Sequence, residues 1–179
     1  MTPGARIAAA IVILEKLERS NSSADDVVSS YLRGRRYIGS KDRRAITGRV
    51  FDILRRQARL DWHTETPSPR SRVIADLKLN DMQSKDAIST LFDGKGYAPS
   101  TLTVDETALL DKLSDHSFDD AEYPAAVAAE LPDWLTEILV AQWKDKFVEE
   151  AAALNRPASL DLRVNMLKGN CARAIQVMR

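Results

Sequence analysis

The sequence of 179 residues contains one cysteine, Cys171, and no long uninterrupted apolar run. A single cysteine cannot form a disulfide within the chain, which agrees with a reducing compartment. The longest apolar run ends at Leu14 and is far too short to span a bilayer; Glu15 and Lys16 follow it directly. Those charges, and the lack of a small-residue cleavage site, argue against export. We therefore expect a cytoplasmic protein with no membrane partner.

Motifs for catalysis, cofactors and metals are also lacking. The segment Gly94-Lys95-Gly96 follows no predicted strand and lacks the Gly-Lys-Ser/Thr ending of a P-loop, so we interpret it as a turn. His63 and His116 have neither a cysteine nor a second histidine at ligand spacing. We expect Cys171 to be a small buried apolar residue and not a nucleophile. The sequence thus predicts no catalytic, cofactor-binding or metal-binding residue in this chain.

Positive charge, in contrast, is concentrated in one segment of a chain whose formal net charge is zero. Residues 33–59 contain ten Lys or Arg and two Asp, which gives 10 − 2 = +8 and leaves −8 for the remainder. Within it, "RGRRYIGSKDRR" at 33–44 has six cationic side chains and one anionic one. Such a segment raises the local concentration of a polyanion, while the acidic remainder limits binding elsewhere.

Capping residues and apolar periodicity predict helices through the first two thirds of the chain. Thr2 and Pro3 begin a helix that ends before 19–23, and Ser23 caps a helix over 24–33 that a left-handed Gly34 closes. A third helix runs from Gly39 and Ser40 to about Leu60. Further helices are predicted after Ser68, over 84–93 up to Gly94, and after Thr103, whose capping-box partner is Glu106.

The third predicted helix separates apolar from basic side chains. At 100° per residue, one side carries Ile46, Val50, Ile53, Leu54 and Ala58, and the other carries Arg44, Arg49, Arg55, Arg56 and Arg59. The apolar side is expected in the core. The basic side is either a solvated charged face or a surface that binds nucleic acid or phosphate. We favour binding, because a solvated face more often mixes charges of both signs.

The last third of the chain is predicted to contain shorter elements of mixed type. An acidic linker is predicted around 114–124, followed by short helices that are interrupted at Pro132 and end before Pro157. Residues 159–165, "SLDLRVN", alternate apolar and polar side chains and predict a strand. Another helix begins at Cys171. Because a single strand cannot satisfy its hydrogen-bonding edges, we expect that the chain is a fragment cut inside a second domain.

Several segments resemble a known family. "GARIAAAIVILEKL", "YLRGRRYIGSKDRRAITGRVFDILRR" and "LFDGKGYAP" are similar to the N-terminal region of the bacterial Sun/RsmB-type ribosomal RNA cytosine methyltransferases. "LPDWL" and "LNRPASLDLRVNMLK" resemble the segment that leads into the catalytic region of that family. The resemblance covers nearly the whole chain but less than half of a full family member. Its most specific feature is Leu-Arg-Val-Asn followed by Leu-Lys.

This resemblance implies a mainly α fold. It implies a NusB-like all-helical RNA-binding bundle over 1–125 and, over 126–179, the start of a small α/β segment that leads into a methyltransferase domain. In the family, that domain uses S-adenosylmethionine, and a cysteine thiolate attacks C6 of cytosine so that C5 can accept the methyl group. The present chain departs from the pattern, since it has no cofactor loop and no Pro-Cys or Thr-Cys motif. We expect it to be inactive alone, with S-adenosylmethionine bound by a C-terminal domain of the parent protein.

The expected partners are ribosomal RNA of the small subunit and the parent protein's own methyltransferase domain. Tyr31 and Tyr37 flank the basic loop and are candidates for base stacking, with simple packing as the alternative. Alternatives are a stand-alone, non-enzymatic NusB-type factor in antitermination or ribosome assembly, and a helical module for an acidic protein partner. The residues predicted to contact RNA phosphates are Arg33, Arg35, Arg36, Lys41, Arg43, Arg44, Arg49, Arg55, Arg56 and Arg59.

Overall fold

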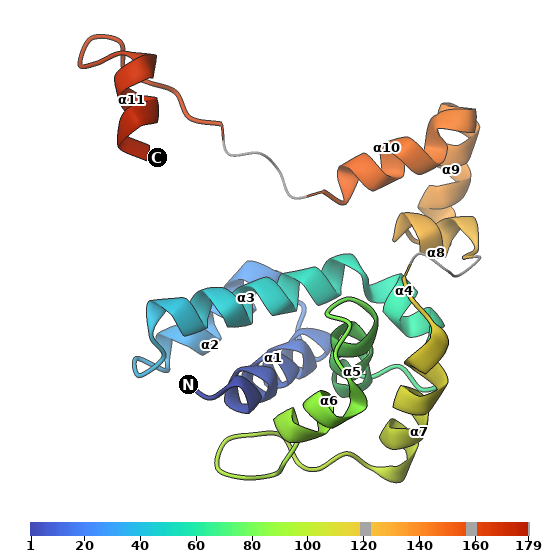
Figure 1. Ribbon diagram of the computed structural model, residues 1–179. Helices are drawn as coiled ribbons and strands as arrows, with labels where there is room; N and C mark the ends of the chain where they lie inside the picture. Colours follow the sequence, from blue (N-terminus) through green and yellow to red (C-terminus); the bar gives the residue numbers. More distant parts are fainter. Residues whose placement is uncertain (119–122, 157–160, 179) are drawn as a thin grey trace.

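The computed structural model describes residues 1–118, 123–156 and 161–178, and these residues form helices and no strand. Figure 1 shows α1 to α7 gathered together, with α8 next to α4, α9 and α10 beyond α8, and α11 apart from them. The mainly α prediction is therefore confirmed. The helices are α1 Pro3–Glu18, α2 Ala24–Arg33, α3 Ser40–Arg55, α4 Gln57–Trp62, α5 Pro69–Leu79, α6 Lys85–Leu91, α7 Val104–Lys112, α8 Ala125–Ala129, α9 Asp133–Trp143, α10 Phe147–Leu154 and α11 Cys171–Met178, with 3-10 turns at Leu113–Asp115 and Lys144–Lys146.

The predicted caps begin the helices as expected. The Thr2 hydroxyl accepts from the Ala5 N–H at 3.2 Å, and Ser23 accepts from the Asp26 N–H at 3.2 Å. At the start of α7, the Thr103 side chain accepts from the Glu106 N–H and the Glu106 carboxylate accepts from the Thr103 N–H. These bonds satisfy N–H groups that have no partner within the helix.

Two helix ends differ from the predictions. Gly34 closes α2 with φ −68°, in the right-handed region, so its predicted left-handed conformation is wrong. The helix predicted over 40–60 is split at Arg56, where φ is −115° and ψ is 17°. The split is stabilised from outside, because Glu130 caps the new start of α4: its carboxylate accepts from the Ala58 and Arg59 N–H groups at 2.7 and 3.3 Å.

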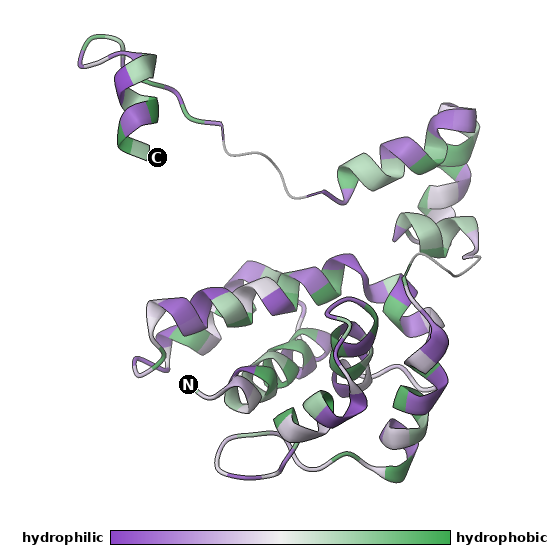
Figure 2. Cartoon of the chain, viewed as in Figure 1, coloured by the Kyte–Doolittle hydropathy of each residue, from purple (hydrophilic) through white to green (hydrophobic). Residues whose placement is uncertain are grey.

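The main hydrophobic core surrounds α1, which contacts α2, α3, α5 and α6. Figure 2 shows that hydrophobic residues run along α1. Ala10 and Ile13 of this helix are fully buried. The predicted apolar side of the basic helix faces this core: Ile46, Val50 and Ile53 are fully buried. Because that side is fixed in the core, the opposite side of α3 is directed away from it.

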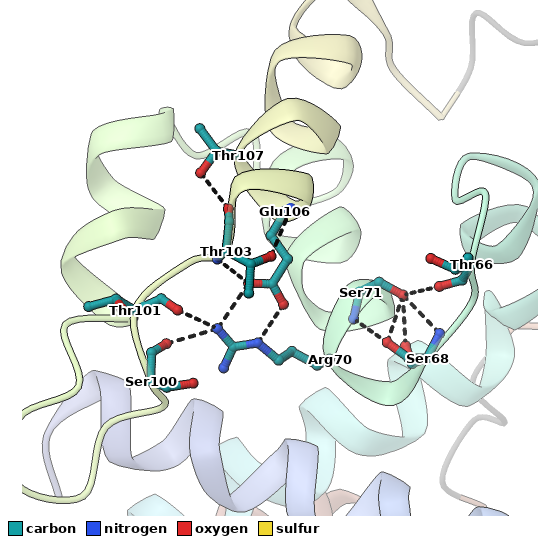
Figure 3. Close-up of polar contacts among 9 residues, drawn as sticks. All are labelled: Thr66, Ser68, Arg70, Ser71, Ser100, Thr101, Thr103, Glu106 and Thr107. Carbon is teal, nitrogen blue, oxygen red and sulfur yellow. Dashed lines mark hydrogen bonds and ion pairs between the residues drawn. The ribbon is translucent and has the colours of Figure 1, made fainter.

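Arg70 joins the start of α5 to the start of α7 (Figure 3). Its guanidinium donates to both oxygens of Glu106, at 2.5 and 3.0 Å, and to the carbonyls of Ser100 and Thr101. Burial alone would raise the pKa of Glu106, but hydrogen bonds from Arg70 and Thr103 outweigh it and lower that pKa. This cluster positions α7 on the bundle and uses one arginine entirely for structure.

A second, smaller apolar cluster holds α8, α9 and α10 together. Ala129, Phe147 and Ala151 are buried in it, and Leu139 and Trp143 pack against them. Its core residues are distinct from those of the main core. Glu130, at the end of α8, links this cluster to the main bundle, because its carboxylate accepts hydrogen bonds from Ala58 and Arg59 in α4.

The C-terminal part of the chain differs from the sequence-based expectation. Residues 161–165 form no strand, and 159 and 160 lie outside the described residues. A strand needs a hydrogen-bonded neighbour, and the described residues supply no second strand. Cys171 is exposed at the start of α11, so its expected burial is wrong. Among the described helices, none has the length and apolar character needed to cross a membrane.

Two helical glycines provide a test of the packing around α1. A Cβ at Gly4 would lie 2.8 Å from the Leu91 carbonyl oxygen and 2.9 Å from the Ala98 Cβ, whereas a Cβ at Gly48 in α3 meets nothing within 4 Å. We expect Gly4→Ala to lower the free energy of unfolding by about 1–3 kcal/mol through overpacking. Gly48→Ala should raise it by about 0.5–1 kcal/mol, because alanine favours the helix. Urea unfolding measures both; equal effects would contradict the close approach at Gly4.

Candidate nucleic-acid interface

Six cations at 33–44 form the basic loop surface, at the end of α2, in the loop that follows and in the start of α3. Four of them are exposed, and within the described part of the chain they have neither a hydrogen bond nor an ion pair: Arg33, Arg36, Lys41 and Arg44. Gly39 provides no side-chain cap for α3, so the first N–H groups of this helix also face the loop without a side-chain acceptor from the N-cap. The side chains best able to contact a polyanion therefore come from one short segment, 33–44.

The other two cations of the basic loop surface, Arg35 and Arg43, hold the loop in shape. Arg43 donates to the carbonyls of Ile38 and Arg35 at 2.8 and 3.2 Å. Arg35 donates to the Tyr31 carbonyl at 3.2 Å, and its guanidinium lies 3.8 Å from the centre of the Tyr31 ring. Neither arginine has a carboxylate partner among the described residues. They therefore organise the loop while their positive charge stays uncompensated.

The acid of this segment, Asp42, is committed to the N-terminus. Its carboxylate accepts from the Met1 amino group at 2.9 Å and from Arg6 at 2.8 Å. The hydrogen bond from the amino terminus is the largest of the effects that lower the pKa of Asp42. Asp42 thus compensates Met1 and Arg6 and not the cations of the basic loop surface.

Farther along the basic helix, Arg49 and Arg56 pair with a buried acid of α5. Asp76 is fully buried; it accepts from Arg49, and from Arg56 at 3.3 Å. Arg49 also donates to Asp81 at 2.5 Å. Burial raises the pKa of Asp76 more than the neighbouring arginines lower it. Burial alone would lower the pKa of Arg49, but the hydrogen bonds that Arg49 donates to Asp81 and Asp76, together with the negative charges of these acids, raise it. These two arginines hold α3 against α5.

The last two predicted arginines also have acidic neighbours. Arg59 donates to the buried Glu130 carboxylate at 2.8 Å, and Arg55 forms an exposed pair with Asp52 at 3.2 Å. An exposed pair of this kind contributes little and leaves Arg55 available to a ligand. The ten predicted contact residues therefore separate into an uncompensated group at 33–44 and a group at 49–59 with carboxylate partners.

The two tyrosines predicted to stack on bases differ in exposure. Tyr37 is 73% exposed in the loop, whereas Tyr31 is 8% exposed and the Arg35 guanidinium covers its ring. Burial is the main cause that raises the pKa of Tyr31, so its hydroxyl stays protonated at neutral pH. The structure favours packing for Tyr31 and leaves Tyr37 as the stacking candidate.

The two histidines lie beside each other, with their ring centres 6.0 Å apart. His63 is buried, and its Nε2 lies 2.9 Å from the Tyr123 hydroxyl. Burial is the largest cause that lowers the pKa of His63, followed by the charges of His116 and Lys112. Among the residues that the structure describes, no group of His, Cys, Asp and Glu side chains is arranged to hold a metal ion.

One cation near the basic loop surface was missed in the sequence. Lys16, in the last turn of α1, is exposed, and its Nζ lies 5.6 Å from the centre of the Tyr31 ring. It lies outside the basic segment, and only the packing of α1 against α2 brings it to Tyr31. No local spacing rule could have revealed it.

Comparisons of the chain with protein-family models, curated proteins and solved structures return no match. The functional interpretation therefore depends on the charges, contacts and exposure described above.

The buried pair network provides a test of which arginines are structural. We expect Asp76→Ala to lower the free energy of unfolding by about 3 kcal/mol, because it leaves Arg49 and Arg56 without their buried partner. Asp52→Ala removes the exposed partner of Arg55 and is the matched control, with an expected change below about 0.5 kcal/mol. Denaturant unfolding of both variants checks this difference. A mild effect at Asp76 would mean that the basic helix is held by apolar packing alone.

Proposed function

We propose that this chain is an RNA-binding region that docks ribosomal RNA through the basic loop surface. The observation that carries the proposal is the partition of the cations. The arginines at 49–59 have acidic partners, while those at 33–44 have no carboxylate partner within the described residues. Like charges held together without compensation cost stability, and a polyanion offsets that cost.

The geometry favours contacts to phosphates over reading of sequence. Arg33, Arg36, Lys41 and Arg44 are exposed and unpaired in the described chain, so they can follow a phosphate backbone. Tyr37 is the exposed aromatic next to them and provides a surface for one unpaired base. A loop held by the hydrogen bonds of Arg43 keeps these groups in a fixed arrangement. The expected result is an orienting contact with structured RNA.

We further propose that the RNA is presented to a methyltransferase domain, as the resemblance to the Sun/RsmB-type family implies, with a NusB-like bundle as the docking unit. Such a domain would bind S-adenosylmethionine. Exposed apolar side chains support it, because a neighbouring domain would bury them: Leu162, Met166, Leu167, Ile175, Val177 and Met178. A stand-alone NusB-type factor has less need of these residues.

The RNA-binding proposal predicts a defined response to charge reversal. The wild-type chain should bind a structured ribosomal RNA fragment, with affinity that falls steeply as salt rises. Arg36→Glu combined with Arg44→Glu should weaken binding at least about tenfold for every RNA sequence tested, because phosphate contacts are lost. Fluorescence anisotropy over a salt series measures both the affinity and its salt dependence.

The matched control is Lys95→Glu combined with Lys146→Glu, which changes the net charge equally at exposed positions elsewhere. Its affinity should stay within about threefold of wild type, since distant charges are screened. If the two double variants weaken binding equally, the surface is not the docking site. Tight binding to an acidic protein with no RNA binding would favour the helical module for a protein partner.

A further inference from the structure

A groove opens beside the basic loop surface, between the end of α1 and α2. Its volume is about 440 Å³, and its charged and aromatic lining consists of Lys16, Asp26, Tyr31, Arg33 and Arg35. At about 30 Å³ for each water molecule, this space holds a phosphate group together with several waters. Arg33 and Arg35 belong to both the groove and the basic loop surface, so the two are continuous.

Three cations of the groove lack carboxylate partners. The side chains of Lys16 and Arg33 have no hydrogen bond or ion pair within the described residues, and the Arg35 side chain donates only to the Tyr31 carbonyl. Lys16 and Arg35 both lie against the Tyr31 ring, at 5.6 and 3.8 Å from its centre. The ring attracts both cations to one place although they repel each other. The Tyr31 hydroxyl, which burial keeps protonated, adds no negative charge.

The acid in the lining is already engaged. Asp26 accepts from the Ser23 hydroxyl at 2.8 Å, and its position in the first turn of α2 compensates the helix dipole. The lining still has an excess of positive charge: three cations and one anion give 3 − 1 = +2. The Ser30 hydroxyl also lines the groove and can donate a hydrogen bond to an oxyanion.

We infer that this groove binds a single phosphate group of the docked RNA, held by Lys16, Arg33 and Arg35, of which Lys16 and Arg35 are positioned by the Tyr31 ring. The inference rests on the proposed function and deepens it. The basic loop surface would attract the backbone as a whole, while a phosphate fixed in the groove sets the register of the RNA on the bundle. Lys16, which lies outside the basic segment, is therefore a binding residue.

The first experiment uses inorganic phosphate as the probe on the full 179-residue chain. Sodium phosphate is titrated against sodium chloride at matched ionic strength, and the amide resonances of the ¹⁵N-labelled protein are followed by NMR. We expect saturable phosphate-specific shifts around Ser30, Tyr31 and Arg33. Lys16→Ala should weaken phosphate about tenfold, since it removes a charge-assisted hydrogen bond. The control Lys95→Ala, at an exposed lysine outside the groove, should bind phosphate as wild type does.

The second experiment adds a structured RNA without phosphate in the buffer. The same resonances should shift, and inorganic phosphate should then compete at this group of amides. Shifts that are scattered over all cations, or that reach half-saturation at the same RNA concentration in Lys16→Ala as in wild type, would overturn the groove as a site. If phosphate binds in the groove but RNA neither causes the same shifts nor displaces phosphate, the groove is not a site for an RNA phosphate.

The two proposals can fail separately. In one outcome, Arg36→Glu combined with Arg44→Glu loses RNA affinity while Lys16→Ala binds RNA and phosphate as wild type does. This outcome refutes the groove as a site and leaves the basic loop surface as the docking site. A phosphate site abolished by Lys16→Ala in a chain that binds no RNA refutes the proposed function and the RNA assignment together. Circular dichroism confirms that each variant is folded, as expected for substitutions of exposed side chains.

Discussion

The buried carboxylate of Asp76 determines how the basic helix is used. A fully desolvated anion needs partners, and Asp76 pairs with two arginines. Arg49 lies in α3, and Arg56 lies directly after its last residue. This fixes the rotation of α3 on α5, with Ile46, Val50 and Ile53 directed into the core. It also removes two cations from the surface. The charge that remains for a ligand is therefore displaced toward the N-terminal end of the helix, where the chain enters from α2.

Local chemistry predicted much of the bundle. Thr2, Ser23, Ser68 and Thr103 cap the helices expected of them, because a cap depends on residues within one turn. The apolar side of the basic helix was also predictable, since helical periodicity is fixed by backbone geometry. What the sequence could not reveal is the partner of each arginine. Asp76 and Glu130 lie 20 and 71 residues from the arginines Arg56 and Arg59 that they bind, and only the packed fold brings them together.

The same limit applies to the candidate site. The ten cations lie in one segment of the sequence with only two acids among them, yet the fold gives them different roles: Arg43 supports the loop, Arg49 attaches the helix and Arg44 is exposed. Lys16 joins them only through the contact of α1 with α2. The strand expected over 159–165 was predicted from its alternating pattern alone, and its described residues form no strand. An alternating pattern indicates a preference for extended backbone, whereas a strand also requires a hydrogen-bonded neighbour.

Glu130 connects the start of α4 to the ion pair of Arg59. Its backbone is in the left-handed region, with φ 55°, and its carboxylate holds both the first N–H groups of α4 and the Arg59 guanidinium. Displacement of α8 would therefore remove the cap of α4 and the carboxylate partner of Arg59 together. Arg59 would keep its contact with the Phe118 ring, whose centre lies 5.2 Å from the guanidinium carbon. The start of one helix and the compensation of one arginine thus depend on the same side chain.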